Sequence, residues 1–271
     1  MLEEAGSGHS AGPLGMADVF ATLYFDVLTH DPKNPTMEGR DRLVLSAGHI
    51  CPVLYATLAE AGYFPRKELL TLRKFGSRLQ GHPHNLALPG IENSSGPLGQ
   101  GISQAIGMNL ALKANNSKAS VYVVTGDGEL QEGQIWEALM FAGARQLSRL
   151  VLTIDRNNIQ IDGPTEKIMP LEPLADKLHA FNWHVIEVDG HNIRQLRDAY
   201  AEARAIVEKP VCVLAHTIPG KGVEYMEHDY RWHGIPPGLQ DVSGAPPKAE
   251  QAAVALSQLR TLSGRITSEH E

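Results

Sequence analysis

The sequence predicts an α/β fold with three layers, in which a parallel sheet lies between two layers of helices. Short apolar runs rich in Val and Ile alternate with longer stretches of helical periodicity, and this alternation of strand and helix is typical of a parallel sheet. Runs such as VYVVT at 121–125 and LVLTI at 150–154 are apolar almost throughout. Such runs fit strands that helices cover on both faces.

The individual elements follow from these two patterns. In chain order, strands are expected at the apolar runs RLVLS (42–46), VYVVT (121–125), LVLTID (150–155), HVIEVD (184–189) and VCVLAHT (211–217). Helices are expected at the segments of helical periodicity between them, residues 13–28, 49–61, 98–114, 131–146, 171–181 and 193–207.

The two ends of the chain differ from this regular middle. Residues 234–248 are rich in Pro and Gly, which is a linker composition, and one more helical pattern spans 249–262 before a polar tail at 267–271 that we expect to fray. We therefore predict a main domain at 1–237, with a linker and a C-terminal helix at 238–271. A glycine-rich loop begins within six residues of Met1, and no element is expected before it.

Composition limits the classes of function. The 271 residues are 42% hydrophobic and 20% charged, as in ordinary soluble globular proteins. A net charge of -7 without a dense basic stretch argues against nucleic acid or an anionic membrane as a partner. Cys51 and Cys212 lie in apolar runs and predict buried thiols in a reducing compartment. With no apolar run of membrane length and no signal peptide, we expect a cytoplasmic protein.

An acid between two glycines marks the first candidate site. Asp127 follows the strand at 121–125, and Asn157 follows the next strand. Ligands of open parallel sheets lie outside the carboxyl ends of the strands. A carboxylate and an amide oxygen suit Mg²⁺, which shares its other positions with phosphate oxygens, so we predict a metal-bridged diphosphate. The simpler alternative is a strand-to-helix turn that Asp127 caps.

Four histidines beside glycine form the second candidate group: His9, His49, His82 and His233. Any one alone is typical of a surface or core histidine. Together they predict a polar site that several loops assemble for proton transfer near neutral pH. His82 and His84 could instead bind a metal, but no second pair at zinc spacing supports this.

The segment SSGPLGQG at 94–101 is the third feature. Its glycines predict a tight turn before a helix, and Pro97-Leu98 places an apolar side chain where it could pack against a flat ring. A helix N-terminus with glycines for close packing is the alternative. Residues 8–12 match the G-x-S-x-G pattern of hydrolases, but the strand that this pattern requires before it is not expected here.

Taken together, these segments resemble the transketolase family, and in particular its N-terminal half, which binds thiamine diphosphate. The Gly-Asp-Gly followed by Asn157 is shared broadly among thiamine-diphosphate enzymes. The segments SGH, AGH, GHPH, GPLGQG and WHG, in this order, are similar to transketolase itself. The resemblance runs from about Gly6 to Pro237 and implies the family's parallel-sheet, thiamine-diphosphate-binding fold.

The resemblance implies a role for each matching residue. The metal, Mg²⁺ or in its place Ca²⁺ or Mn²⁺, would be bound by Asp127, the Asn157 side chain and the Ile159 carbonyl. The cofactor would contact His49, Gly96, Pro97, Leu98, Gly128, Asn157 and His233. The catalytic groups would be His9, His82 and His233, around the reacting carbon and the sugar hydroxyls, and Glu132, which matches a family glutamate linking two active sites across the dimer.

The sequence also departs from the family pattern. Ser10-Ala11 follow His9 where the family usually has Pro-Gly, and Glu129 could add negative charge near the metal. The helix that precedes the SGH loop in the family is missing. The second domain of a transketolase, which supplies a glutamate for the aminopyrimidine and arginines for the sugar phosphate, is not found after Pro246.

We therefore expect the N-terminal subunit of a split transketolase. It would transfer a two-carbon ketol unit from a ketose phosphate to an aldose phosphate only with a C-terminal, pyrimidine-binding subunit, and it would homodimerise within a heterotetramer. Pentose phosphates are the default substrates, with sulfosugars and branched sugars left open. Two other classes stay open: a subunit of another thiamine-diphosphate enzyme, such as a 2-oxo acid dehydrogenase or a synthase, and a non-catalytic cofactor-binding remnant.

Overall fold

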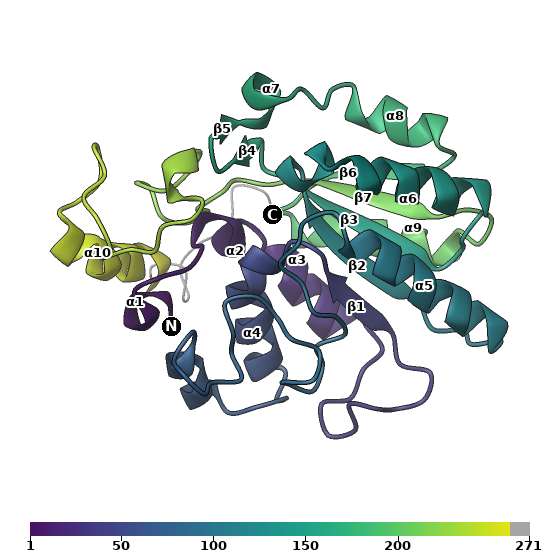
Figure 1. Cartoon of the computed structure of the whole chain (residues 1–271), viewed down its shortest axis with the longest axis horizontal. Helices are drawn as coiled ribbons and strands as arrows, with labels where there is room; N and C mark the ends of the chain where they lie inside the picture. The colour runs from purple at the N-terminus through teal and green to yellow at the C-terminus, as the bar shows by residue number, and fades with distance from the viewer. Residues whose placement is uncertain (261–271) are drawn as a thin grey trace.

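The computed structural model describes residues 1–260, and within them five strands form one parallel sheet. Its order is β1-β2-β3-β7-β6 (Figure 1). The strands are β1 (Arg42–Leu45), β2 (Val121–Gly126), β3 (Leu150–Arg156), β6 (His184–Asp189) and β7 (Val211–His216). All five lie where the sequence predicts them. A small antiparallel hairpin, β4 (Ile159–Gln160) with β5 (Gly163–Pro164), follows the end of β3.

The helices lie between the strands, as predicted, and several short turns join them. The longer α-helices are α4 (Cys51–Glu60), α5 (Gly101–Ala114), α6 (Gly133–Ala144), α8 (Leu174–Ala180), α9 (Ile193–Ala205) and α10 (Lys248–Arg260). The shorter ones are α1 (Leu2–Ala5), α2 (Ala11–Gly15), α3 (Ala17–Thr22) and α7 (Thr165–Ile168). The other helical turns are η1 (Leu23–Val27), η2 (Gly48–Ile50), η3 (Arg66–Thr71), η4 (Gly128–Gln131) and η5 (Tyr230–Trp232).

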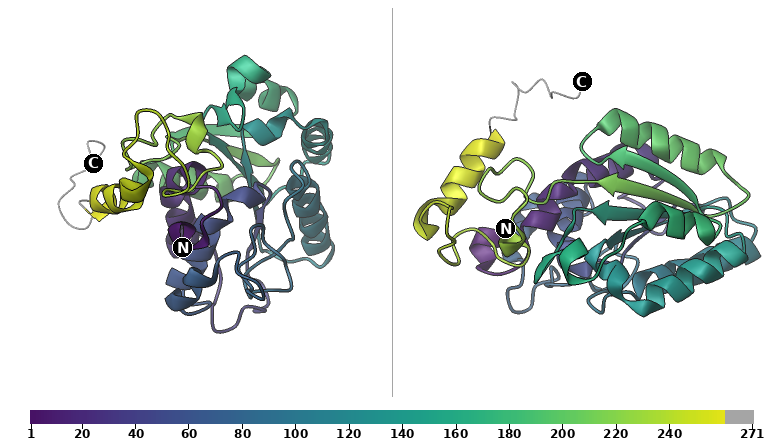
Figure 2. Two further views of the ribbon diagram at one scale, coloured as in Figure 1. Left: turned by 60° about the vertical axis from the view of Figure 1, so that its left-hand side comes forward. Right: turned by 90° about the horizontal axis from the view of Figure 1, so that it is seen from above.

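Two hydrophobic clusters, one on each face of the sheet, confirm the three-layer α/β/α fold. Side chains alternate along each strand: Tyr122 and Val124 pack with α3, α4 and α9, while Val121 and Val123 pack with α5, α6 and α8. Figure 2 shows the sheet between α9 on one side and α5 and α6 on the other. Burial on both faces explains why these strands are apolar almost throughout.

The N-terminal segment differs from the prediction in two ways. The helix expected at 13–28 is broken at Met16, and its last turn is a π-helical one, η1. The break lies where the chain passes close to its own backbone, because a Cβ at Gly15 would lie 2.8 Å from the carbonyl oxygen of Ile218. A one-turn helix, α1, precedes the glycine-rich loop where no element was expected, and it ends at Gly6, which has a left-handed φ of 59°.

A third cluster joins the C-terminal segment to the rest of the chain. Trp232 is fully buried and packs with Ala11, Val242 and Ala255, the last on α10. The buried Gln251 side chain also holds the Pro/Gly-rich stretch, because it accepts from the Gly238 N–H and donates to two carbonyls. The domain boundary after Pro237 stays a prediction, and residues 261–262 of the expected last helix and the tail at 267–271 lie outside the described residues.

Two further predictions concern the cysteines and membrane-spanning segments. Both cysteines are free and buried, as predicted. In the part of the chain that the structure describes, no helix combines the length and the apolar character that crossing a bilayer requires.

The close contact between α6 and the turn after α8 gives a test of the packing. A Cβ at Gly143 would lie 1.7 Å from the carbonyl oxygen of Phe181, so Gly143→Ala must displace backbone. We expect it to lower the free energy of unfolding by about 1–3 kcal/mol, measured by chemical denaturation. The matched control is Gly107→Ala on α5, where a Cβ meets nothing within 4 Å. It should raise stability by about 0.5–1 kcal/mol, and equal effects of the two would contradict this packing.

Candidate functional site

The carboxyl ends of β1, β2 and β3 meet at one edge of the sheet, because the three strands are parallel and in register. A cavity of about 380 Å³ lies at this edge. It is lined by every predicted site residue except Pro97, namely His9, His49, His82, Gly96, Leu98, Asp127, Gly128, Glu132, Asn157, Ile159 and His233. Residues that are up to 224 positions apart in the sequence (233 minus 9) are thus gathered around one space.

Asp127 is the buried acid of this cavity, with 1% of its surface exposed. Its Oδ1 accepts from the Gly128 N–H at 2.7 Å, and its Oδ2 accepts from the Asn158 N–H at 2.7 Å and from Arg156 Nη1 at 2.8 Å. Burial raises the pKa of Asp127 to about 6, and Arg156 and the two backbone donors oppose that rise. Asp127 caps the short turn η4, as the simpler alternative required, but it also lines the cavity.

Asp155 orients Asn157, the second predicted metal ligand. The Asn157 amide nitrogen donates to Asp155 Oδ2 at 2.8 Å, and its oxygen accepts from the Ile159 N–H at 3.0 Å. Thr217 donates to the other oxygen of Asp155, whose pKa burial raises to about 7. The amide is therefore fixed in one orientation, and its oxygen keeps a lone pair for a further partner.

Gly128 brings the hairpin after β3 against the end of β2. A Cβ at Gly128 would lie 2.8 Å from the Gln160 Cβ and 3.7 Å from the Ile159 carbonyl oxygen. The absence of a side chain thus lets the Ile159 carbonyl lie close to the Gly-Asp-Gly segment. Among residues 1–260 no group of three His, Cys, Asp or Glu side chains could hold a metal. One carboxylate, one amide and one carbonyl are a different donor set, of oxygens only, and this set suits Mg²⁺.

Three histidines form a compact cluster on the cavity wall. The ring centroids of His9, His49 and His233 lie 4.9 to 5.3 Å apart. The Nδ1 atoms of His9 and His233 are buried and have no hydrogen-bond partner among the described residues. Burial lowers the pKa of His9 to about 4, lowers that of His49 well below its ordinary value, and lowers that of His233. The three rings are therefore neutral at pH 7, and each offers one donor and one acceptor.

His82 and Arg73 lie at the exposed side of this cluster. Burial lowers the pKa of His82, and the charge of Arg73 acts in the same direction on His82 and His9. The Arg73 guanidinium lies against the loops that carry both histidines, since a Cβ at Gly81 would be within 2.9 Å of it and one at Gly8 within 3.5 Å of its Nε. Glycine at position 81 thus leaves room for the arginine, whereas a Cβ at Gly8 would meet Leu2 Cδ2 at 2.7 Å and Arg73 only at ordinary contact distance.

Glu129, the second acid beside Asp127, also lines the cavity. Its Oε1 accepts from Ser46 Oγ at 2.5 Å and from the Gly99 N–H at 2.8 Å, and its Oε2 accepts from the Gly126 N–H at 3.2 Å. The acid is bound by donors of three segments, so it ties the 94–101 loop to the ends of β1 and β2. Its effect on the charge near the metal stays a prediction. Gly101 also lets the 94–101 loop lie close to the end of β1, because a Cβ at that position would be 2.4 Å from the Ser46 Cβ.

The remaining predicted residues lie at the rim. Pro97 and Glu132 are exposed, and 38% of the Leu98 surface is exposed. No strand precedes the Gly8–Gly12 pattern, since α1 and a turn occupy residues 2–6, and the hydrolase alternative therefore lacks its structural context.

Sequence reasoning missed Arg156 and Asp155 as members of this site. Both are polar residues within the last two positions of an otherwise apolar strand, β3, which places them at the sheet edge where ligands bind. Their position at the end of the strand was the feature from which the sequence could have predicted them as site residues. Their partners on other segments, Thr217 and Glu172 among them, could not be read from spacing.

Comparison with known proteins identifies the family to which the chain is similar. The family model described as "Transketolase, thiamine diphosphate binding domain" matches residues 1–249. Among curated proteins, the 6-deoxy-6-sulfo-D-fructose transketolase subunit of a Clostridium species is 46% identical over 237 residues, covering 86% of each chain. One subunit of the apulose-4-phosphate transketolase of Phocaeicola vulgatus is 41% identical over 241 residues, covering 89% of this chain and 85% of that protein.

Solved structures give the same result for the fold. Transketolase from Leishmania mexicana superposes with a TM-score of 0.82 at 34% identity, covering 97% of this chain and 42% of that one. Transketolase from Pichia stipitis in complex with sedoheptulose 7-phosphate has a TM-score of 0.84 at 32% identity, with 97% and 43% covered. The chain thus spans about two fifths of the length of these solved proteins.

The histidine cluster predicts how stability depends on pH. Because the pKa of His9 is lowered from 6.5 to about 4 in the folded state, the unfolded chain binds a proton first as the pH falls. The stabilisation is complete above pH 6.5 and is lost as the pH falls towards 4. His9→Gln should therefore lose less stability than the wild type over this interval, by on the order of 1–3 kcal/mol in urea unfolding. Parallel pH profiles for the two proteins would contradict the prediction.

Proposed function

This chain belongs to the transketolase family, and we propose that it is the thiamine-diphosphate-binding subunit of a transketolase made of two kinds of chain. The complex would transfer a two-carbon ketol unit from a ketose to an aldose. The observation that carries this proposal is a single cavity lined both by the three neutral histidines and by the strand-end residues Asp127 and Asn157.

The residues of the cavity fit a diphosphate cofactor with its metal. The oxygens of Asp127, Asn157 and the Ile159 carbonyl are a donor set that suits Mg²⁺, which would leave its other positions to phosphate oxygens. The Gly128 backbone and His49 lie at the same cavity and would contact the diphosphate. Gly96, Pro97 and Leu98 would lie along the aminopyrimidine. The buried, unpartnered Nδ1 atoms of His9 and His233 also indicate a polar ligand.

The cofactor, when bound, supplies an electron sink that allows the carbon–carbon bond beside a ketone to break. The chain's own residues would bind the substrate and move protons. Neutral His9 and His233 can each donate one hydrogen bond and accept another, which suits a sugar hydroxyl that loses or gains its proton. His82, on the exposed side of the cluster, would contact hydroxyls farther along the sugar.

The donor proposed is a ketose with a terminal anionic group, whose two-carbon ketol unit passes to an aldose that also carries such a group, leaving an aldose two carbons shorter than the donor. A ketose phosphate is the default donor. The names of two relatives support a wider range, because one acts on a sulfo-fructose and the other on apulose 4-phosphate. A sulfonate and a phosphate are both tetrahedral anions, so the arginines that the partner subunit is expected to supply could bind either.

A second chain would complete the site. The two relatives that this chain matches over 86% and 85% of their own lengths are named as subunits. Glu132 and Leu98 line the cavity and are exposed, as is Pro97 next to Leu98 in the chain, so a partner could cover them. We propose that this partner is a C-terminal, pyrimidine-binding subunit. This chain would homodimerise within a heterotetramer, with Glu132 reaching towards the neighbouring active site.

Substitution of the buried acid tests the metal site. Asp127→Asn removes the charge at nearly constant volume, so Mg²⁺-dependent binding of thiamine diphosphate should weaken by about 100-fold or more in calorimetry, as for loss of a charged ligand. Asp189→Asn is the matched control, because Asp189 ends the parallel strand β6 outside the cavity. Equal affinities for both variants and the wild type would show that Asp127 does not bind the metal.

Reconstitution tests the division of the enzyme between chains. We expect no ketol transfer from the purified chain with Mg²⁺ and thiamine diphosphate. Activity should appear when a C-terminal transketolase subunit encoded by an adjacent gene is added. Xylulose 5-phosphate with ribose 5-phosphate is the first substrate pair, followed by sulfo-fructose and apulose 4-phosphate as donors. Full activity of the chain alone would contradict the two-chain proposal, and cofactor binding without activity in any mixture would favour a non-catalytic remnant.

A further inference from the structure

We propose that Arg156 is a positioning residue that makes Asp127 a one-oxygen ligand and so matches the site to Mg²⁺ in preference to a larger cation. This assignment rests on the proposed function, because it concerns the same metal site. Arg156 is an unexpected neighbour for such a site, since a cation beside a metal ligand repels the metal. The contacts around it explain how both can be accommodated.

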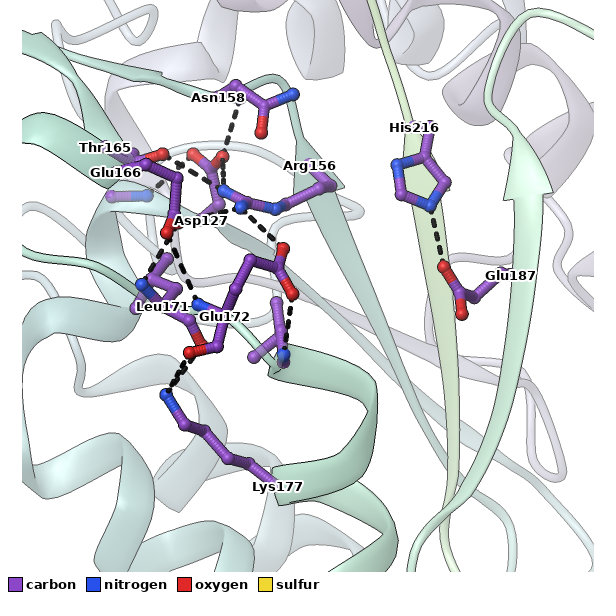
Figure 3. Close-up of polar contacts among 12 residues, drawn as sticks. Asp127, Arg156, Asn158, Thr165, Glu166, Leu171, Glu172, Lys177, Glu187 and His216 are labelled. Atoms are coloured by element: carbon purple, nitrogen blue, oxygen red, sulfur yellow. Dashed lines mark hydrogen bonds and ion pairs between the residues drawn. The ribbon is translucent and has the colours of Figure 1, made fainter.

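Arg156 lies at the end of β3 with only 3% of its side chain exposed. Its Nη1 donates to Asp127 Oδ2 at 2.8 Å and to Thr165 Oγ1 at 3.0 Å. Its Nη2 donates to Glu166 Oε1 at 2.9 Å and to Glu172 Oε1 at 2.7 Å. Figure 3 shows the guanidinium between Asp127 and the two glutamates. A planar group held on both sides in this way has one available orientation.

The contacts of Arg156 limit how many oxygens Asp127 can offer to a cation. Each carboxylate oxygen accepts about two hydrogen bonds in the carboxylate plane. Oδ2 already has two donors, Arg156 Nη1 and the Asn158 N–H. Oδ1 has one, the Gly128 N–H, and keeps one lone pair for a further partner. Asp127 can thus give a cation one oxygen but not two.

One-oxygen ligation favours Mg²⁺ over Ca²⁺. Mg²⁺ requires near-octahedral geometry with short bonds, whereas Ca²⁺ readily takes both oxygens of a carboxylate in a larger, more flexible shell. If Arg156 were absent, Oδ2 would keep only one backbone donor and could join Oδ1 on a larger ion. Arg156 therefore acts on the choice of metal through the geometry of Asp127.

Glu166 and Glu172 offset the charge that Arg156 brings. The three carboxylates and one guanidinium together carry a charge of about -2, which favours a divalent cation, whereas the pair of Arg156 and Asp127 alone would be neutral. Both glutamates are held in turn by backbone donors, Glu166 by the Leu171 N–H and Glu172 by the Leu174 N–H. The loop between α7 and α8 is thereby tied to the metal ligand.

The experiment measures metal preference with the full-length chain. Dissociation constants for Mg²⁺ and for Ca²⁺ are determined by calorimetry with thiamine diphosphate present, and their ratio is compared between variants. In Arg156→Met the ratio of the two dissociation constants should shift about tenfold towards Ca²⁺, because loss of a group that orients a metal ligand weakens Mg²⁺ binding more than Ca²⁺ binding, whereas loss of the positive charge acts on both divalent ions alike. A ratio is insensitive to the fraction of chain that is folded, and a role in folding alone would leave it unchanged.

A second variant tests the charge of the cluster without removing the buried arginine. The double variant Glu166→Gln, Glu172→Gln changes two side chains that are 37% and 55% exposed. It should weaken the binding of both ions several-fold and leave the ratio of their dissociation constants unchanged, since Arg156 still occupies Asp127 Oδ2. Arg197→Met is the control, because Arg197 forms an exposed pair with Asp26 outside the cavity.

An unchanged ratio in Arg156→Met would overturn the assignment. If that variant does not fold, a wild-type chain that binds Ca²⁺ as tightly as Mg²⁺ would overturn it. A wild-type chain that binds neither ion with the cofactor would instead overturn the proposed function, and this assignment with it. The two failures are therefore distinguishable from one set of titrations.

Discussion

The carboxylate of Asp127 is buried at the carboxyl end of a central parallel strand, and a buried negative charge is costly unless donors or cations surround it. Much of the local structure meets this requirement. The Gly128 and Asn158 N–H groups and Arg156 all donate to it, and Arg156 is held in turn by Glu166 and Glu172, which accept from its Nη2. The raised pKa of Asp127 shows that these donors do not remove the cost completely. A divalent cation at the free lone pair would do so, which links the architecture of the sheet edge to the chemistry we propose.

On the histidine side of the cavity the groups are neutral, in contrast to the charged carboxylate of Asp127. Burial disfavours the protonated forms of His9, His49 and His233 and lowers the pKa of each, and for His9 and His49 repulsion by a neighbouring imidazolium adds to this effect. The cluster therefore stays neutral where the acid side stays charged. Such a cavity offers oxygen ligands for a metal and diphosphate together with neutral groups that exchange protons with a sugar. A thiamine-dependent transfer reaction needs both.

The fold was predictable from the sequence because it follows from local patterns, whereas part of the site, such as Glu132 and the Ile159 carbonyl, was predictable only from the resemblance to the transketolase family. Apolar runs identified all five strands of the sheet, and residues placed just after those runs, such as Asp127 and Asn157, had to meet at one edge. Features that depend on contacts between residues far apart in the sequence could not be predicted in this way. The helix expected at 13–28 breaks at Met16 beside Gly15, whose backbone packs against Ile218, and nothing in the local sequence reports that neighbour. The hydrogen bonds of Glu129 could not be predicted for the same reason, since its partner Ser46 lies at another strand end.

The sequence by itself thus determined the three-layer fold, the strand-end location of the acid and amide, and the set of histidine loops, because strand periodicity and chain order are local properties. Only the tertiary structure decided which groups neutralise one another. Arg156 is adjacent to Asn157 in the chain, yet its guanidinium reaches Asp127 on the neighbouring strand and Glu172 on a later loop. Pairing of buried charges depends on distance in space and on exclusion of water, and neither is encoded in the spacing of residues along the chain.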